Sequence, residues 1–263
     1  MIYAIDNISF AYDSGNILEG ISIQLEKGYF YGILGPNGCG KTTFLDLLIR
    51  HKKPNSGSIM FSGTDLSKIS RKQLARKIAL VSQNFYINFP YTVREVVIMG
   101  RYPYISRFSS PSSKDLDRVD SIMEKTGVDL LSDNFITELS GGERQRVVFA
   151  RALVQDTDVI ILDEATSNLD IRHTIDLLDI VRKRVDQKKL TVISVFQDIN
   201  LAARYCDRLI FLRNGTILAQ GKTEEMINED LIQKVFDVES EIRFEPLYNT
   251  SQVIFKRGAH AVL

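Results

Sequence analysis

Apolar and polar residues alternate along the first part of the chain, and this pattern changes at residue 29. Segments 3–10 and 16–25 alternate and are separated by turns, which predicts antiparallel strands. The run at 29–34 is apolar throughout and predicts a buried strand, and residues 42–50 read as the helix that follows it. The residues between this strand and this helix are rich in glycine. Strand, glycine loop and helix in this order are the context of a phosphate-binding loop.

The rest of the chain switches between helical and strand patterns. Between residues 83 and 152 the strand signal disappears and several helical segments follow, which predicts an inserted helical subdomain. Apolar runs at 159–162 and 191–195 flank a helix at 174–185 and predict that the parallel sheet resumes. We therefore expect an α/β fold: a P-loop NTPase core with a mixed sheet, an antiparallel N-terminal β subdomain and an inserted α-helical subdomain.

Shorter elements are predicted from local signals. Asn214-Gly215 between two strand patterns is a strong hairpin signal. The other expected elements are a helix at 70–77, a strand at 78–82, hairpin strands at 208–213 and 216–220, a helix at 230–236, and weak strands at 241–244 and 252–255.

Composition narrows the class of protein. At 263 residues the chain can form one large domain with a helical insert. Lysine plus arginine and aspartate plus glutamate both number 33, so there is no net field to attract nucleic acid, and we expect no nucleic-acid partner. No apolar run approaches the ~20 residues of a membrane span, and we expect a soluble chain. The two cysteines, Cys39 and Cys206, are far apart and predict neither a zinc site nor a disulfide.

The glycine-rich segment from Gly35 to Thr42 fits the eight-position phosphate-loop pattern. Its glycines let backbone N–H groups surround the phosphates, Lys41 reaches the β- and γ-oxygens, and the Thr42 hydroxyl ligates Mg²⁺. The alternative is a chance glycine turn, which the flanking strand and helix disfavour. Cys39 is interpreted as a small filler of the loop; the alternative is a redox sensor, because a helix amino terminus lowers a thiol pKa.

Asp163 and Glu164 end the apolar run at 159–162. In P-loop enzymes one such carboxylate holds Mg²⁺ and its neighbour orients or deprotonates the attacking water, so we assign Asp163 to the metal and Glu164 to the water. Leu139-Ser140-Gly141-Gly142-Glu143 has the pattern of a helix start with uncovered N–H groups, which would also bind phosphate. Solvated acids and an ordinary helix start are the alternative interpretations of these two segments.

Taken in order, these motifs resemble the ATP-binding subunits of ABC transporters over nearly the whole chain, from about residue 3 to residue 226. The resemblance implies one ATPase domain over 1–225, with a core of 1–82 and 158–225, a helical subdomain at about 83–157, and a C-terminal extension at 226–263. It implies ATP and Mg²⁺ as cofactors, Lys41, Glu164 and Gln197 as catalytic residues, and Thr42, Gln83 and Asp163 as metal ligands. The implied ATP-binding residues are Tyr12, Gly35, Pro36, Asn37, Gly38, Cys39, Gly40, Lys41, Thr42, Thr43, Gln83, Ser140, Gly141, Gly142, Gln145 and Asp170.

By the same resemblance, Tyr12 stacks on adenine and the signature at residues 140–145 reaches the γ-phosphate held by a second copy of the chain. A tyrosine at a strand end is, on sequence alone, more often a packing residue.

Two positions depart from the family pattern. Ala165 stands where proline is usual, and Gln197 stands where the family has the H-loop histidine. Glutamine donates a neutral hydrogen bond but carries no charge and shuttles no proton, which predicts low turnover with ATP binding retained. Gln197 is either a natural variant or a substitution introduced to stall the ATP-bound state.

Within the family the chain most resembles subunits of iron-siderophore, haem and cobalamin importers. The segments that carry this likeness are 70–76, 97–104 and 198–207. It implies transmembrane permease subunits as partners, an extracytoplasmic substrate-binding protein as an indirect partner, and a peripheral position at the cytoplasmic face of the inner membrane. The aromatics Phe85, Tyr86, Phe89 and Tyr91 would contact the permease or pack within the subdomain. The alternatives are a soluble ABC ATPase without a permease, as in iron–sulfur assembly, and a weakly hydrolysing nucleotide clamp.

Overall fold

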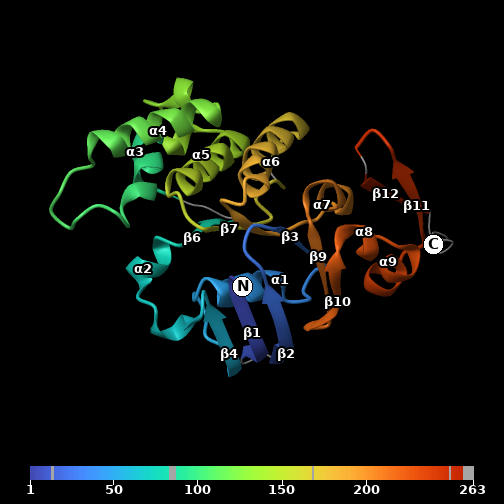
Figure 1. The fold of residues 1–263 in the computed structure, drawn as a ribbon. Coiled ribbons are helices and arrows are strands. Elements are labelled where there is room, and N and C mark those ends of the chain that lie inside the picture. Colours follow the sequence, from blue (N-terminus) through green and yellow to red (C-terminus); the bar gives the residue numbers. More distant parts are fainter. Residues whose placement is uncertain (13–14, 83–86, 168, 249, 257–263) are drawn as a thin grey trace. The chain divides into compact units, whose positions relative to one another are not determined.

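The computed structural model describes residues 1–12, 15–82, 87–167, 169–248 and 250–256, and it divides into two compact units (Figure 1). Unit 1 comprises residues 1–68 and 193–263, and unit 2 comprises residues 69–192. The narrower helical subdomain expected at about 83–157 stays a prediction. None of the described helices is both long enough and apolar enough to span a bilayer.

Unit 1 contains most of the strands. Its elements are β1 (Tyr3–Tyr12), β2 (Gly15–Leu25), β3 (Phe30–Leu34), α1 (Lys41–Leu48), β4 (Ser56–Phe61), β5 (Thr64–Asp65), a 3₁₀ turn (Leu66–Lys68), α7 (Ile199–Tyr205), β9 (Arg208–Arg213), β10 (Thr216–Lys222), α8 (Thr223–Met226), α9 (Glu229–Phe236), β11 (Ser240–Glu245) and β12 (Thr250–Phe255).

Unit 2 contains most of the helices. Its elements are α2 (Arg71–Ala75), β6 (Ile78–Val81), α3 (Val93–Ile98), α4 (Ser113–Lys125), α5 (Gly141–Val154), β7 (Val159–Asp163) and α6 (Ile171–Asp186), with 3₁₀ turns at Met99–Arg101, Asp129–Leu131 and Ile136–Glu138. Strand β8 (Thr191–Val195) runs from unit 2 into unit 1.

An antiparallel sheet in unit 1 has the strand order β2-β1-β4-β5, which confirms the N-terminal β subdomain. The alternating pattern buries one face of each strand, and Ile5 pairs with Ile23 on β2 and with Ile59 on β4. Figure 1 shows β1, β2 and β4 side by side. The buried Tyr3 hydroxyl donates to Leu48 O at 3.0 Å and so joins this sheet to α1.

The second sheet region of unit 1 is mixed, as expected. Strand β3 pairs in parallel with β9, and β9 pairs antiparallel with β10. All five residues of β3 are buried, in keeping with its continuous apolar sequence. Asn214 and Gly215 have φ values of 49° and 76°, the left-handed pair that a tight two-residue hairpin requires, so the hairpin predicted from Asn-Gly is confirmed.

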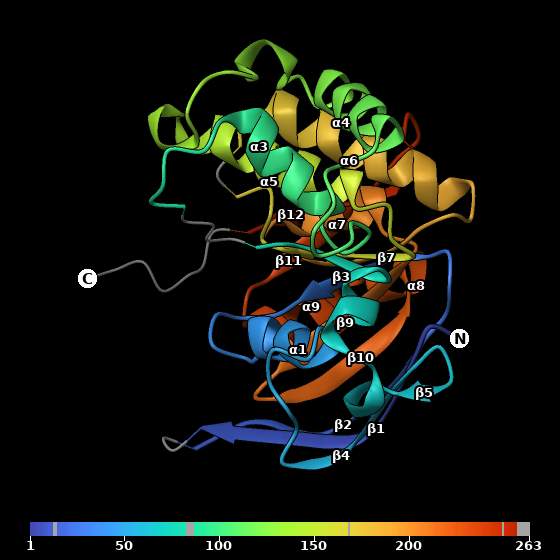
Figure 2. The same ribbon diagram turned by 90° about the vertical axis from the view of Figure 1, so that its left-hand side faces the viewer.

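Unit 2 packs α3, α4 and α5 around one apolar cluster, and Figures 1 and 2 show these three helices together. The cluster consists of Val93, Val96, Val97, Val119, Met123, Val128, Ile136, Leu139, Val147, Ala150 and Val154. Each of these helices begins with a reciprocal capping box, which satisfies N–H groups that have no partner within the helix. Strands β6 and β7 pair in parallel in the same unit. Helix α6 begins at Ile171, three residues before the expected start, because Asp170 caps it.

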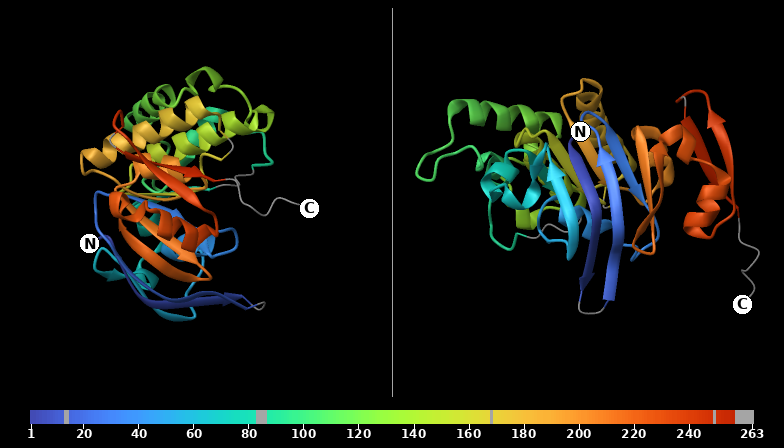
Figure 3. Two further views of the ribbon diagram at one scale, coloured as in Figure 1. Left: turned by 90° about the vertical axis from the view of Figure 1, so that its right-hand side faces the viewer. Right: turned by 60° about the horizontal axis from the view of Figure 1, so that its bottom comes forward.

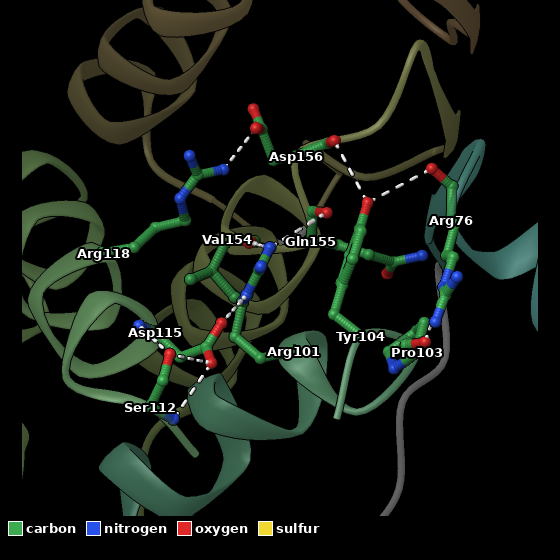
Figure 4. A network of polar contacts seen from close by, with 10 residues as sticks. All are labelled: Arg76, Arg101, Pro103, Tyr104, Ser112, Asp115, Arg118, Val154, Gln155 and Asp156. Atoms are coloured by element: carbon green, nitrogen blue, oxygen red, sulfur yellow. Dashed lines mark hydrogen bonds and ion pairs between the residues drawn. The ribbon is translucent and has the colours of Figure 1, made fainter. Parts of the chain in front are cut away.

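A polar network fixes the end of α5 to the surrounding segments of unit 2 (Figure 4). Arg101 donates to Asp115 Oδ1 at 2.8 Å and to Val154 O at 3.0 Å, and both charged side chains are largely buried. Asp115 also caps the start of α4 with Ser112. The Tyr104 hydroxyl contacts the carbonyl oxygens of Arg76 and Asp156. These contacts connect segments that are distant in sequence and hold the last turn of α5 in place.

The segment after β10 adds the helices α8 and α9 and a hairpin to unit 1. The weak strand signals at 241–244 and 252–255 are confirmed as β11 and β12, which pair antiparallel. Figure 3 shows this hairpin beside α7 and α9. The Thr250 hydroxyl donates to Ala203 O at 2.9 Å, which joins β12 to α7.

Candidate nucleotide-binding and hydrolysis site

The expected site residues are divided between the two units. Unit 1 carries Tyr12, the loop from Gly35 to Thr43, and Gln197, whereas unit 2 carries the signature residues, Asp163, Glu164 and Asp170. Gln83, Phe85, Tyr86 and Asn168 lie outside the described residues.

The phosphate loop joins the buried strand β3 to α1, and its backbone requires glycine. Gly35 and Gly40 have φ values of 155° and 101°. A Cβ at Gly35 would lie 2.1 Å from Leu212 O, and one at Gly40 would lie 2.6 Å from Leu18 Cδ2. Gly38 also has a positive φ of 79°, but a Cβ there would meet nothing within 4 Å. The loop is therefore packed against the unit at both ends and open in its middle, where a phosphate would enter.

Lys41 lies at the start of α1 with only 8% of its surface exposed. Its Nζ donates to Gly35 O at 2.8 Å and to Pro36 O at 3.0 Å. The ammonium group thus bonds the backbone of the same loop in which we expect it to bind phosphate. Thr42 is exposed, whereas Thr43 is buried.

Cys39 is a buried thiol within this loop. Burial raises its pKa above the ordinary value, and the nearby Lys41 charge offsets this only in part. The alternative interpretation as a redox sensor needed a lowered pKa, because the thiolate is the reactive form. Burial of the thiol and the raised pKa both favour Cys39 as a filler.

Tyr12 is the last residue of β1, and the charged side chain of Lys52 links its ring to α1. The Lys52 ammonium lies 5.6 Å from the Tyr12 ring centroid and also bonds Asp46 of α1 at 2.7 Å. The bond to Asp46 raises the pKa of Lys52, so the ammonium stays charged beside the ring. The Tyr12 side chain is 44% exposed, and its ring meets Phe10 edge-on with centroids 5.0 Å apart. This exposed ring, linked through Lys52 to the helix that follows the phosphate loop, has the chemistry of a base platform.

Gln197 lies in the turn between β8 and α7 and is exposed. The preceding residue, Phe196, donates its N–H to Ile33 O at 3.1 Å, and Ile33 is two residues before Gly35. The next residue, Asp198, caps α7 by accepting from the N–H groups of Asn200 and Leu201. The structure therefore brings the Gln197 turn beside the strand that enters the phosphate loop.

In unit 2, Asp163 and Glu164 follow the buried strand β7. Asp163 is 9% exposed and Glu164 is half-buried. Glu164 has a φ of 48°, which a residue with a side chain rarely adopts. Ser167 donates to Glu164 O through its N–H at 3.1 Å and its hydroxyl at 2.9 Å. The two carboxylates thus lie where the buried strand β7 ends and a tight turn begins.

The signature begins α5 with a complete capping box. Ser140 Oγ accepts from Glu143 N at 3.3 Å, and Glu143 Oε2 accepts from Ser140 N at 2.9 Å. The Ser140 hydroxyl also donates to Glu143 Oε2 at 2.7 Å, and this bond together with that from Ser140 N lowers the pKa of Glu143. A Cβ at Gly141 would meet nothing within 4 Å, so this helix start is open to a ligand.

Gln145 and Asp170 have partners within unit 2. Gln145 is buried, and its Nε2 donates to Ala165 O at 2.9 Å with a longer contact to Ser82 O at 3.5 Å. Asp170 accepts from His173 N and contacts His173 Nδ1, both at 2.8 Å, and these bonds lower its pKa. Their expected contacts with nucleotide stay predictions. Lys52 and Gln155 had no signal in the sequence, since each is recognised only through residues that folding brings near.

The residues present fit ATP and Mg²⁺ chemically. The open glycine loop and the Lys41 ammonium suit a polyphosphate, and exposed Tyr12 suits a base. The Thr42 hydroxyl and the Asp163 carboxylate are oxygen donors of the kind that Mg²⁺ uses together with substrate phosphates.

Comparison with known proteins adds independent findings. A family model described as ABC transporter matches residues 18–167. The achromobactin transport ATP-binding protein CbrD of Dickeya dadantii is 37% identical over 92% of this chain and 90% of its own length. The ferric enterobactin transport ATP-binding protein FepC of Escherichia coli is 36% identical over 95% of this chain and 92% of its own length.

Two solved structures resemble the fold. A metal-chelate type ABC transporter in an inward-facing conformation matches with a TM-score of 0.83 and 25% identity, covering 97% of this chain and 98% of that one. The dimeric ABC transporter cassette MJ0796 matches with a TM-score of 0.76 and 26% identity, covering 84% of this chain and 99% of that one.

Proposed function

The chain belongs to the ABC transporter family, and on that premise we propose that it is the ATP-hydrolysing subunit that powers a membrane importer. Two copies would hold two ATP molecules between them, because each chain carries a phosphate loop and a separate open helix start at its signature. The dimeric relative supports this arrangement. The observation that carries ATP binding is the open glycine loop with Lys41 folded onto it.

The proposed roles follow from the chemistry of each group. Lys41 would exchange its two carbonyl partners for phosphate oxygens, and Tyr12 would stack on adenine. Thr42 and Asp163 would hold Mg²⁺, with Gln83 as a further ligand. Bound Mg²⁺ would neutralise charge on the phosphates. Glu164 would orient the attacking water and accept its proton, and Gln197 would donate a neutral hydrogen bond near the γ-phosphate.

The cargo we propose is an iron chelate of the siderophore type, with haem and cobalamin as the other candidates. The names of CbrD and FepC support this class, since both serve siderophore transport. The chain itself would contact permease subunits at the cytoplasmic face of the membrane and would meet a substrate-binding protein only indirectly. The exposed aromatic Phe89 in unit 2 would belong to the permease contact.

Affinity purification from gently solubilised membranes tests this function. We expect a polytopic membrane protein to co-purify in equal amount with the tagged chain and to identify the importer. Recovery from the soluble fraction alone, with no membrane partner, would reject the importer and favour the soluble ATPase.

A further inference from the structure

The turn that carries Glu164 is held by bonds from two directions. Its left-handed backbone is costly for a residue with a side chain, and such a conformation persists only where neighbouring groups enforce it. Ser167 bonds the Glu164 carbonyl from within the turn. Gln145 bonds the next carbonyl, that of Ala165, from α5. A strained turn enforced in this way presents its side chain in one direction.

Gln145 is placed to act on this turn from a buried position on α5. Its side chain is 5% exposed, and an amide nitrogen has two protons to donate. One is directed at Ala165 O at 2.9 Å, and the other makes the longer contact with Ser82 O, directly after β6. The same helix carries Ser140 and the signature glycines at its start. Helix α5 thus holds the hydrolysis turn through one buried side chain.

We propose that Gln145 is a positioning residue for hydrolysis: it fixes the backbone beside Glu164 and thereby aims the carboxylate at the attacking water. This inference rests on the proposed function, because it takes Glu164 as the group that orients the water. This role takes the place of the nucleotide contact that the family resemblance implies for Gln145, because its side-chain amide is directed at two carbonyl oxygens of unit 2. Its loss should therefore reduce turnover while leaving ATP binding by the loop of unit 1 intact.

Gln155, directly after the same helix, provides a matched control. It follows the last turn of α5, and its Nε2 donates to Ala75 O and to Ile78 O, beside the start of β6. Each glutamine thus contacts two carbonyl oxygens: Gln155 contacts two beside the start of β6, whereas Gln145 contacts one after β6 and one after β7. Only Gln145 reaches the turn of Glu164. Gln145 is buried and Gln155 is half-buried, and substituting each in turn separates the general effect of losing a bonded amide from the specific effect on that turn.

The experiment compares Gln145→Met with Gln155→Met in the full chain. Methionine keeps the volume and removes both donors. We expect both variants to unfold at similarly lowered temperatures and to bind ATP within about twofold of the wild type. For Gln145→Met alone we expect kcat to fall about ten- to a hundredfold, the range for a misplaced catalytic group, with KM little changed.

Each outcome decides the proposal. Equal kcat losses in the two variants, or an unchanged kcat in Gln145→Met, would overturn the positioning role. A wild type that hydrolyses no ATP would overturn the proposed function and this inference with it, so the two failures are distinguishable. If Gln145→Met does not fold, the pair Gln145→Asn and Gln155→Asn repeats the comparison with a polar amide that is one methylene too short to reach Ala165 O.

Discussion

The side-chain amide of Asn200 pairs with the backbone of Val253 as a neighbouring strand would. Asn200 Nδ2 donates to Val253 O at 3.1 Å, and Val253 N donates to Asn200 Oδ1 at 2.7 Å. Asn200 belongs to the first turn of α7, three residues after Gln197, and Val253 is a buried residue of β12. The C-terminal hairpin is therefore bonded to the helix that follows the Gln197 turn.

We expect Asn200→Ala to release the hairpin from α7. The substitution leaves the N–H and C=O of a buried residue without these partners, which costs about 1–3 kcal/mol. Hydrogen exchange at the Val253 amide should quicken, and the free energy of unfolding should fall by a comparable amount. Asn200→Asp is the matched variant, because it keeps the acceptor for Val253 N and loses only the donor. Equal exchange rates in all three proteins would contradict this account of the hairpin.

Lys41→Met should abolish most ATP binding while the loop keeps its fold. The charged hydrogen bonds to phosphate that the ammonium would make are worth about 2 kcal/mol or more, which corresponds to about thirtyfold in Kd. Calorimetric titration with a non-hydrolysable ATP analogue measures the loss. Lys53→Met, which removes an exposed lysine of the same unit, is the control. Similar affinities in the two variants would remove Lys41 from the binding site.

Local sequence signals predicted the elements that carry the site. The apolar run of β3, the glycines before Lys41 and the Asn214-Gly215 hairpin each require a specific backbone, so their patterns specify structure directly. The start of α6 was placed three residues late because Asp170 was interpreted through the resemblance and not as a helix cap.

Contacts between distant segments could not be predicted in this way. Asn200 and Val253 are 53 residues apart, and Gln145 and Ala165 are 20 apart, with no pattern in either segment that identifies its partner. The Lys52 ammonium reaches the Tyr12 ring only after the chain has folded. The alternative of a redox sensor at Cys39 is disfavoured for a similar reason. The sequence shows the helix terminus, which would lower the pKa of the thiol, but not the burial, which raises it.

The Arg101–Asp115 pair should make unit 2 sensitive to acid. The hydrogen bond from Ser112 and that from Arg101 lower the pKa of Asp115 from 3.8 to about 2. The folded state thus prefers the ionised form of Asp115. The contribution of this carboxylate to the free energy of unfolding is therefore fully present above pH 4 and is lost as the pH falls toward 2. The shift corresponds to about 2 kcal/mol. Asp115→Asn should flatten the dependence of unfolding free energy on pH in that range, and an unaltered slope would argue against the pair.

Glu164→Gln should keep ATP binding and stop hydrolysis. The amide has nearly the shape of the carboxylate but accepts no proton from water, and the loss of a general base lowers kcat by about 10²–10⁴-fold. Because ATP is then not consumed, the ATP-bound dimer should accumulate, and size-exclusion chromatography with light scattering measures it. Normal turnover in this variant would reject Glu164 as the residue that activates water.

Gln197→His tests one of the two positions at which the sequence differs from the pattern that the family resemblance implies. The Gln197 turn is fixed at both sides, by Phe196 N to Ile33 O and by the Asp198 cap, so a new side chain there keeps its place. Histidine can carry charge and transfer a proton, which glutamine cannot, and we expect kcat to rise about tenfold or more while the Kd for ATP changes little. Gln197→Ala, which removes the neutral donor as well, should hydrolyse more slowly than the wild type. Steady-state ATPase assays of the three proteins should therefore rank them histidine, glutamine, alanine. An activity unchanged by Gln197→His would show that this position does not limit turnover, and the low activity expected of the wild type would then lack its cause.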